Sequence, residues 1–207
     1  MKSTSLTQLV LVALLSLAGC GHTGEVAAGS AALPVSTLPD AGGEVVAPYY
    51  PLQVGNEWRY RVKLLGESST QTISILDQVD GWFRDSTGER FRVDRYGLRT
   101  PERYLLKGPI ARGTRWSVVL SINSTEHYEI SAVGVGVSVP AGNFRACLRV
   151  EGRNRVDERT TFFKEDTYCP TVGLVRVRTW VDVAGTGQVP QAEIELTSYS
   201  LKDGAAS

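Results

Sequence analysis

The chain has 207 residues, 22 basic and 22 acidic side chains, and a hydrophobic content of 42%. Balanced charge argues against nucleic acid or a bulk anionic surface as the partner. Length and hydrophobic content suit a single globular domain with a real core.

The N-terminus reads as a secretory signal that ends at a cysteine. Lys2 precedes an apolar run from Leu6 to Leu17, which is too short to span a bilayer and ends in small residues. The tetrapeptide Leu17-Ala18-Gly19-Cys20 resembles the lipobox of bacterial lipoproteins. The resemblance implies that residues 1–19 are removed and that lipidated Cys20 becomes the new N-terminus. The alternative is an ordinary secretory signal with a chance cysteine.

The residue after the cysteine bears on the location of the protein. Position 21 is Gly, whereas an Asp there would resemble the signal for retention in the inner membrane. The resemblance therefore implies the outer membrane, with the side left open between periplasm and exterior. The membrane is thus an expected partner, held through lipid on Cys20, because two or three buried acyl chains anchor firmly.

Residues 20–47 are rich in Gly, Ala, Ser, Pro and Val and show no periodicity. Such a segment buries too little to offset its ordering entropy, so we expect a flexible tether with a reach of roughly 30 Å. The alternative is an arm that packs on the domain through Val45 and Val46. We expect the folded domain to span residues 48–202 and residues 203–207 to form a disordered tail.

The domain reads as a series of strands. Apolar Trp58, Tyr60, Val62 and Leu64 alternate with basic residues, which indicates a half-buried strand. Further strands or hairpins are expected at 70–76, 82–94, 95–98, 133–139, 144–151, 160–164, 173–183 and 192–201. No segment shows an amphipathic helix longer than about two turns. The prediction is an all-β, antiparallel domain.

One turn-and-strand pattern occurs twice. Pro51 to Trp58 and Pro109 to Trp116 both read Pro-(Leu/Ile)-x-x-Gly-(Asn/Thr)-x-Trp. Pro and Gly favour the turn, and Trp is suited to fix the next strand in the core. Trp58 and Trp116 are therefore expected to be core anchors, with the mouth of a ligand cavity as the sharper alternative.

A strand with one bare face follows. Val133, Val135, Val137 and Val139 alternate with residues that include Gly134 and Gly136. A glycine face lets a side chain, another backbone or a ligand approach closely. Core filling is the simpler interpretation, and a small-molecule groove with Trp58 and Trp116 is the other.

Three motifs in order resemble a group of bacterial envelope proteins. They are Tyr50 to Trp58, Val139 to Phe144 and Val172 to Val175. The resemblance implies a curved antiparallel sheet or partly open barrel. It brings no catalytic residue, because the motifs are turns and core anchors.

Cys147 and Cys169 are the cysteines that remain besides Cys20. Alternation places Cys147 on the same strand face as Arg145 and Arg149. A hairpin near residue 156 would bring it close to Cys169. In an oxidising compartment this predicts a disulfide, with two free thiols as the alternative.

No catalytic or metal constellation stands out. The sequence has no Gly-x-Ser-x-Gly and no His-Glu-x-x-His, so we expect no catalytic residue, no metal and no cofactor. Asp77, Asp80 and Asp85 fit solvated turns better than calcium ligands. His127 is a lone histidine in a strand.

These observations favour a non-enzymatic envelope lipoprotein whose β-domain binds or scaffolds other envelope components. A carrier that encloses a lipid or acyl ligand in a curved-sheet cavity is the second hypothesis. A hydrolase with an unrecognised site is the third.

Overall fold

The computed structural model describes residues 46–122 and 124–202. Cys20, most of the tether and the C-terminal tail lie outside these residues. The described chain forms a single sheet of twelve antiparallel strands preceded by a short 3-10 turn, η1 (Ala47–Tyr49). The all-β prediction is therefore confirmed. No helix in the described ranges is long and apolar enough to cross a membrane.

The strands run in chain order with short connections. They are β1 (Glu57–Leu64), β2 (Glu67–Val79), β3 (Trp82–Asp85), β4 (Arg90–Asp94), β5 (Gly97–Arg99), β6 (Tyr104–Lys107), β7 (Arg115–Ser121), β8 (Ser124–Val139), β9 (Gly142–Arg155), β10 (Thr160–Cys169), β11 (Gly173–Val183) and β12 (Gly187–Ser200).

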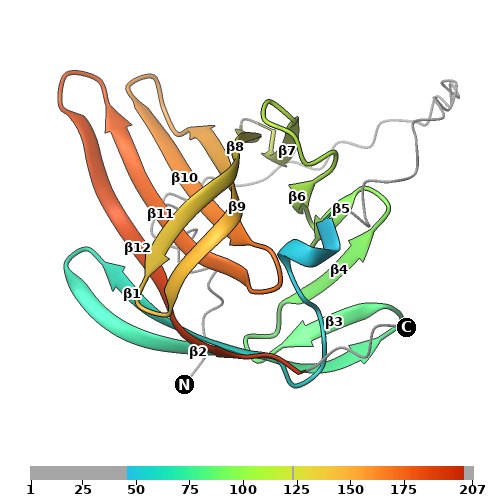
Figure 1. Cartoon of the computed structure of the whole chain (residues 1–207). Helices are drawn as coiled ribbons and strands as arrows, with labels where there is room; N and C mark the ends of the chain where they lie inside the picture. The colour runs from blue at the N-terminus through green and yellow to red at the C-terminus, as the bar shows by residue number, and fades with distance from the viewer. Residues whose placement is uncertain (1–45, 123, 203–207) are drawn as a thin grey trace, which may run out of the picture.

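The sheet order is β6-β5-β4-β3-β2-β1-β12-β11-β10-β9-β8-β7. Every pairing joins strands consecutive in sequence except that of β1 with β12, which lies at the centre. The two edges, β6 and β7, are themselves consecutive, and the sheet curls until they approach each other (Figure 1). The Trp116 indole Nε1 of β7 donates a hydrogen bond to the Tyr104 carbonyl of β6, at 3.1 Å. A side chain thus bridges the seam of a nearly closed barrel.

The period-two pattern of β1 is confirmed. Trp58, Tyr60 and Val62 are buried, while the basic residues between them point outward. On β9, strict alternation would place Ala146 in the core and Cys147 on the face of Arg149. This expectation is wrong, because Ala146 adopts a positive φ of 57° and the register shifts there. Ala146 is consequently exposed, and both Cys147 and Leu148 are buried.

The interior of the sheet is filled by two hydrophobic clusters. The first core cluster draws mainly on β1, β2, β11 and β12 and contains Trp58, Tyr60, Val62, Ile73, Ile75, Val139, Cys147, Cys169, Val172, Val175, Val177, Ile194 and Leu196. The second draws on β4 to β10 and the N-terminal segment and contains Val46, Tyr50, Phe91, Leu98, Leu106, Trp116, Tyr128, Ile130, Leu148, Val150 and Tyr168. Leu52 and Leu174 pack against both.

The N-terminal segment is part of this interior. Val46 and Tyr50 are buried in the second core cluster. The Pro48 carbonyl accepts a hydrogen bond from the Thr171 amide in the β10–β11 turn, at 2.6 Å. Val46, the first described residue, is thus already packed on the domain, as the packed-arm alternative expects for that residue.

The repeated sequence pattern gives repeated geometry. Gly55 and Gly113 both have a φ of 89°. The Gly55 amide donates to the Ile75 carbonyl at 2.9 Å, and the Gly113 amide donates to the Ile130 carbonyl at 2.8 Å. Only a residue without a Cβ adopts that φ freely. In each copy the tryptophan is buried, as the core-anchor interpretation expects.

Cys147 and Cys169 form a disulfide with a Cα–Cα distance of 4.1 Å. It links β9 to the end of β10 and lies within the first core cluster. The predicted pairing is thus present, although the thiols reach each other through the interior and not on the arginine face.

Candidate binding surface

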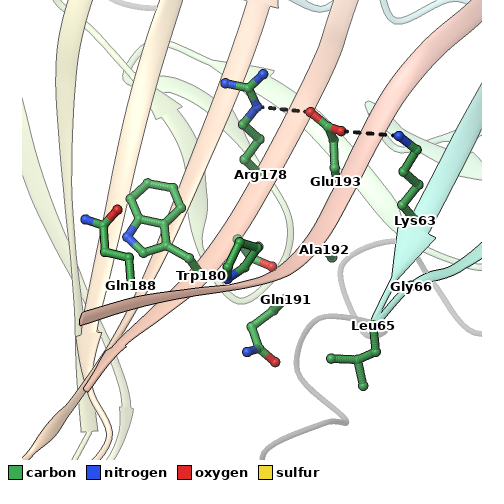
Figure 2. A pocket seen from close by; sticks show the side chains of 11 residues that line it. Lys63, Leu65, Gly66, Arg178, Trp180, Gln188, Gln191, Ala192 and Glu193 are labelled. Atoms are coloured by element: carbon green, nitrogen blue, oxygen red, sulfur yellow. Dashed lines mark hydrogen bonds and ion pairs between the residues drawn. The ribbon is translucent and has the colours of Figure 1, made fainter. Parts of the chain in front are cut away.

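A groove of about 560 Å³ lies on the outer face of the sheet where β1, β12 and β11 meet. Figure 2 shows Trp180 and Gln188 on one side of it, Leu65 on the other and Gln191 between them. The residues that line it are Lys63, Leu65, Gly66, Arg178, Thr179, Trp180, Gln188, Pro190, Gln191, Ala192 and Glu193. We call this the Trp180 groove.

One end of the Trp180 groove is ionic. The Glu193 carboxylate accepts from Arg178 Nε at 3.1 Å and lies 3.9 Å from Lys63 Nζ, as the dashed lines in Figure 2 mark. Two cations on one carboxylate leave local positive charge. That end of the groove therefore suits an acceptor or anionic group.

The ionic end belongs to a charged row that crosses seven strands. Strand register aligns Lys63, Glu193, Arg178, Glu165, Glu151, Glu129 and Arg115. A parallel ion cluster lies beside it, where Glu195 bonds to Arg61 at 2.6 Å and to Arg176 at 3.1 Å. Burial opposes ionisation of Glu195, but the hydrogen bonds from Arg61 and Arg176 outweigh it and lower the pKa of the carboxyl.

A stacked pair of rings lies beside the charged row. Trp180 of β11 lies parallel to Phe163 of β10, with centroids 5.4 Å apart and planes 5° from parallel. The Trp180 Nε1 atom is buried and has no hydrogen-bond partner among the described residues. A buried donor without an acceptor costs about 1–3 kcal/mol.

The turn at the groove mouth breaks a local rule. Leu65 and Gly66, which join β1 to β2, both have positive φ, at 49° and 91°. Two-residue turns of this kind prefer Asn-Gly, because a branched hydrophobic side chain is strained at positive φ. Leu65 is also 70% exposed. An exposed, strained leucine is a local conflict of the kind that marks functional positions.

A second groove, of about 200 Å³, lies on the other side of Phe163 over β7 to β9. It contains His127, whose Nδ1 lies 2.8 Å from Ser117 Oγ. A Ser–His pair could serve a hydrolase if a third group oriented the ring. Among the described residues no carboxylate bonds to His127, and the neighbouring Glu129 bonds to Arg115 at 2.7 Å.

The interior carries a buried polar cluster beside the second core cluster. Arg103 Nη1 lies 3.0 Å from Glu126 Oε2 and 3.4 Å from Tyr128 Oη, and Lys164 Nζ lies 2.8 Å from Asp166 Oδ2. Burial raises the pKa of Tyr128, and although Arg103 lowers it, Glu126 adds to the rise. Tyr128 therefore stays protonated at physiological pH. This cluster stiffens the interior next to the seam.

The structure separates the four residues that the alternative interpretation placed around one ligand cavity. Trp58 lies in the first core cluster, with its Nε1 bonded to the Val172 carbonyl at 2.6 Å, and Trp116 lies in the second. Gly134 and Gly136 are exposed to solvent. The neighbouring residues Val135 and Val137 pack against the first core cluster. Of the four residues, Trp116 borders the His127 groove, and the Trp180 groove contains none of them.

The acidic residues of the β2–β4 region bond to different partners and do not form one cluster. Asp77 pairs with Arg84. Asp85 accepts from the Thr87 and Glu89 amides, at 2.8 and 3.0 Å, and so holds the β3–β4 turn. Within the described ranges no group of three or more His, Cys, Asp or Glu residues could hold a metal ion. The expectation of no metal and no cofactor stays a prediction for the whole chain.

Comparisons with known proteins give two similar structures. One is a protein described as exported, with a YmcC-like fold, from Bacteroides fragilis NCTC 9343, at 13% identity and a TM-score of 0.47 over 74% of this chain and 99% of that chain. The other is a protein described as a lipoprotein from Parabacteroides distasonis ATCC 8503, at 13% identity and a TM-score of 0.39 over 73% of this chain and 98% of that chain. No family model matches the sequence. No curated protein matches it either.

Sequence reasoning missed the Trp180 groove. The outward position of Trp180, beside Arg176 and Arg178, was visible in the alternation of the strand. An outward tryptophan on a charged face was the available signal. The other side of the groove was not visible, because the residues that β1 contributes lie more than 100 positions before Trp180.

Proposed function

We propose that this chain is a lipid-anchored protein of the bacterial envelope whose β-domain binds another envelope component on its outer face. Lipobox-like residues Leu17 to Cys20 support the anchor, and Gly21 supports the outer membrane. The Trp180 groove carries the binding part of the proposal, because it joins an indole ring, two amides and an ionic end in one concave site.

The interior favours this function over a lipid carrier. The two core clusters occupy the inside of the sheet, and buried ion pairs occupy the region beside the seam. An acyl chain would have to displace packed side chains or separate charges. A bound molecule is more easily accommodated on the outer face.

The anchor is tested by intact-mass measurement of the protein purified from its own envelope. The expected result is loss of residues 1–19 and added acyl mass on Cys20. Cys20→Ser should abolish the added mass. An unmodified Cys20 in the wild-type protein would contradict the anchor.

The groove is tested by photo-crosslinking in cells. A photoreactive residue at exposed Gln188 in the groove is compared with the same residue at Gln78, an exposed glutamine on β2. We expect a specific adduct from Gln188 that disappears when Trp180→Ala is added. The same adducts from both positions, or adducts unaffected by Trp180→Ala, would contradict binding in the groove.

We also propose that the domain is not catalytic, since His127 has only Ser117 as a hydrogen-bond partner among the described residues. Ser117→Ala should leave any hydrolytic activity of purified protein unchanged. An ester hydrolysis that is lost in Ser117→Ala would favour the hydrolase hypothesis instead.

A further inference from the structure

Six hairpin turns lie along one edge of the sheet, because neighbouring antiparallel strands turn on alternate edges. The β3–β4 and β5–β6 turns are set back, because β3 pairs only with the last part of β2, Ile75 to Val79. The other four are the β1–β2, β7–β8, β9–β10 and β11–β12 turns. In Figure 1 the β9–β10 and β11–β12 turns stand at the upper left and the β1–β2 turn at the left. We call this edge the hairpin rim.

The hairpin rim carries the most exposed hydrophobic side chains of the described chain. Among the described large hydrophobic residues, the three most exposed are Ile122 at the β7–β8 turn (fully exposed), Val119 near the end of β7 (74%) and Leu65 at the β1–β2 turn (70%). Val156 in the β9–β10 turn and Val189 near the start of β12 are also exposed. Single exposed hydrophobics are ordinary, but one edge that holds the three extremes is not.

A stacked pair of rings lies behind two of the turns. On β10 and β11, Phe163 and Trp180 are followed away from the rim by charged Glu165 and Arg178, while exposed Asp182 lies between Trp180 and the β11–β12 turn. Tryptophan favours the boundary between hydrocarbon and water, and long basic side chains reach back to the aqueous side.

The rim charges are balanced. In the β9–β10 turn, Arg155 and Arg159 are matched by Asp157 and Glu158. Such a rim has no net attraction to anionic lipid, so contact would depend on apolar burial.

We infer that the hairpin rim lies against a lipid bilayer, with Leu65 and Ile122 inserted at the hydrocarbon boundary and the Trp180 groove open at the membrane surface. The inference rests on the proposed anchoring, since the expected tether from Cys20 to Val46, with a reach of roughly 30 Å, keeps the domain near the bilayer. At the high local concentration this creates, a weak contact is sufficient.

The test uses the mature chain, residues 20–207, with Cys20→Ser so that no lipid is attached. Flotation with phosphatidylcholine vesicles measures binding of the protein itself. We expect measurable binding that changes little between low and moderate salt. Leu65→Asn with Ile122→Ser should weaken it by about tenfold or more.

Two features make this variant informative. Leu65→Asn suits the positive φ of the turn, so folding stability should be kept or raised while binding falls. Val79→Ser is the matched control, because Val79 is 64% exposed at the opposite edge of the sheet. It should bind vesicles as the parent does.

A second readout is quenching of tryptophan fluorescence by brominated phosphatidylcholine. It should be reduced in Trp180→Phe, since Trp58 and Trp116 are buried and Trp82 begins β3 at the opposite edge of the sheet. Equal binding by the rim variant and the parent would overturn the inference, as would binding only to anionic vesicles at low salt. Absence of acyl mass on Cys20 with rim binding intact would refute the anchor alone.

Discussion

At the residue scale, the same ion-pair chemistry has two different energetic meanings in this molecule. Arg103 and Glu126 are 11% and 6% exposed and lie at the seam, whereas Arg115 is 73% exposed and pairs with Glu129 on the outer face. Removing one partner of a buried pair leaves an uncompensated charge in a poorly solvated place. Removing a surface partner leaves a charge in water.

The first prediction compares these two pairs. Glu126→Ala should lower the free energy of unfolding by about 3–5 kcal/mol, because Arg103 stays buried without its carboxylate. Glu129→Ala should change it little. Urea unfolding followed by tryptophan fluorescence measures both. Similar losses in the two variants would show that Arg103 is solvated in solution.

The second prediction concerns pH and Glu195. Bonds from Arg61 and Arg176 lower the folded-state pKa below its usual 4.5. The stability that ionised Glu195 contributes is therefore complete above about pH 4.5 and is lost as pH falls through the lower, folded-state pKa. Urea unfolding across the acid range should show the gap between wild type and Glu195→Gln closing as pH drops. A gap that stays constant would contradict the coupling.

At the element scale, the β9–β10 pair is tied by both backbone pairing and the disulfide. Cys147 and Cys169 are separated by 22 residues. A closed loop of this length stabilises by about 3 kcal/mol on the chain-entropy model. The third prediction is a loss of that size in Cys147→Ser with Cys169→Ser, measured by urea unfolding. Reduced wild-type protein serves as the control for side-chain packing, and unchanged stability in both would contradict the prediction.

The fourth prediction tests the seam. Trp116→Phe keeps an aromatic ring stacked on Tyr128 but removes the hydrogen bond to the Tyr104 carbonyl. Hydrogen exchange should become faster in β6, because that edge strand has lost its only hydrogen bond to β7 among the described residues. Trp58→Phe is the matched change in the repeated motif. It should leave exchange in β6 as it is.

The strands themselves could be predicted well because period-two alternation reports burial directly. Trp58, Tyr60 and Val62 have the expected faces. The β9 bulge could not be predicted, because nothing in an alanine at position 146 signals a positive φ. The partner strand imposes it, through compensating shifts near Gly134 on β8.

At the scale of the whole molecule, the Trp180 groove could not be predicted for a topological reason. It requires Leu65 of the β1–β2 turn to meet Trp180 of β11 and Pro190 of β12. Pairing of β1 with β12 brings them together, and no local pattern encodes a pairing over that separation. Hairpins followed from local patterns, whereas the curved, partly open barrel was expected only from the resemblance of three motifs to a group of envelope proteins.

That closure has a consequence for biosynthesis. A ribosome makes β1 first and β12 last, yet these two strands form the middle of the finished sheet. Until the final strand has emerged, the edge of β1 exposes free amides and carbonyls beside Trp58 and Tyr60, which is a template for misassembly with other nascent chains. A chain truncated before Gly187 should therefore aggregate instead of folding in part.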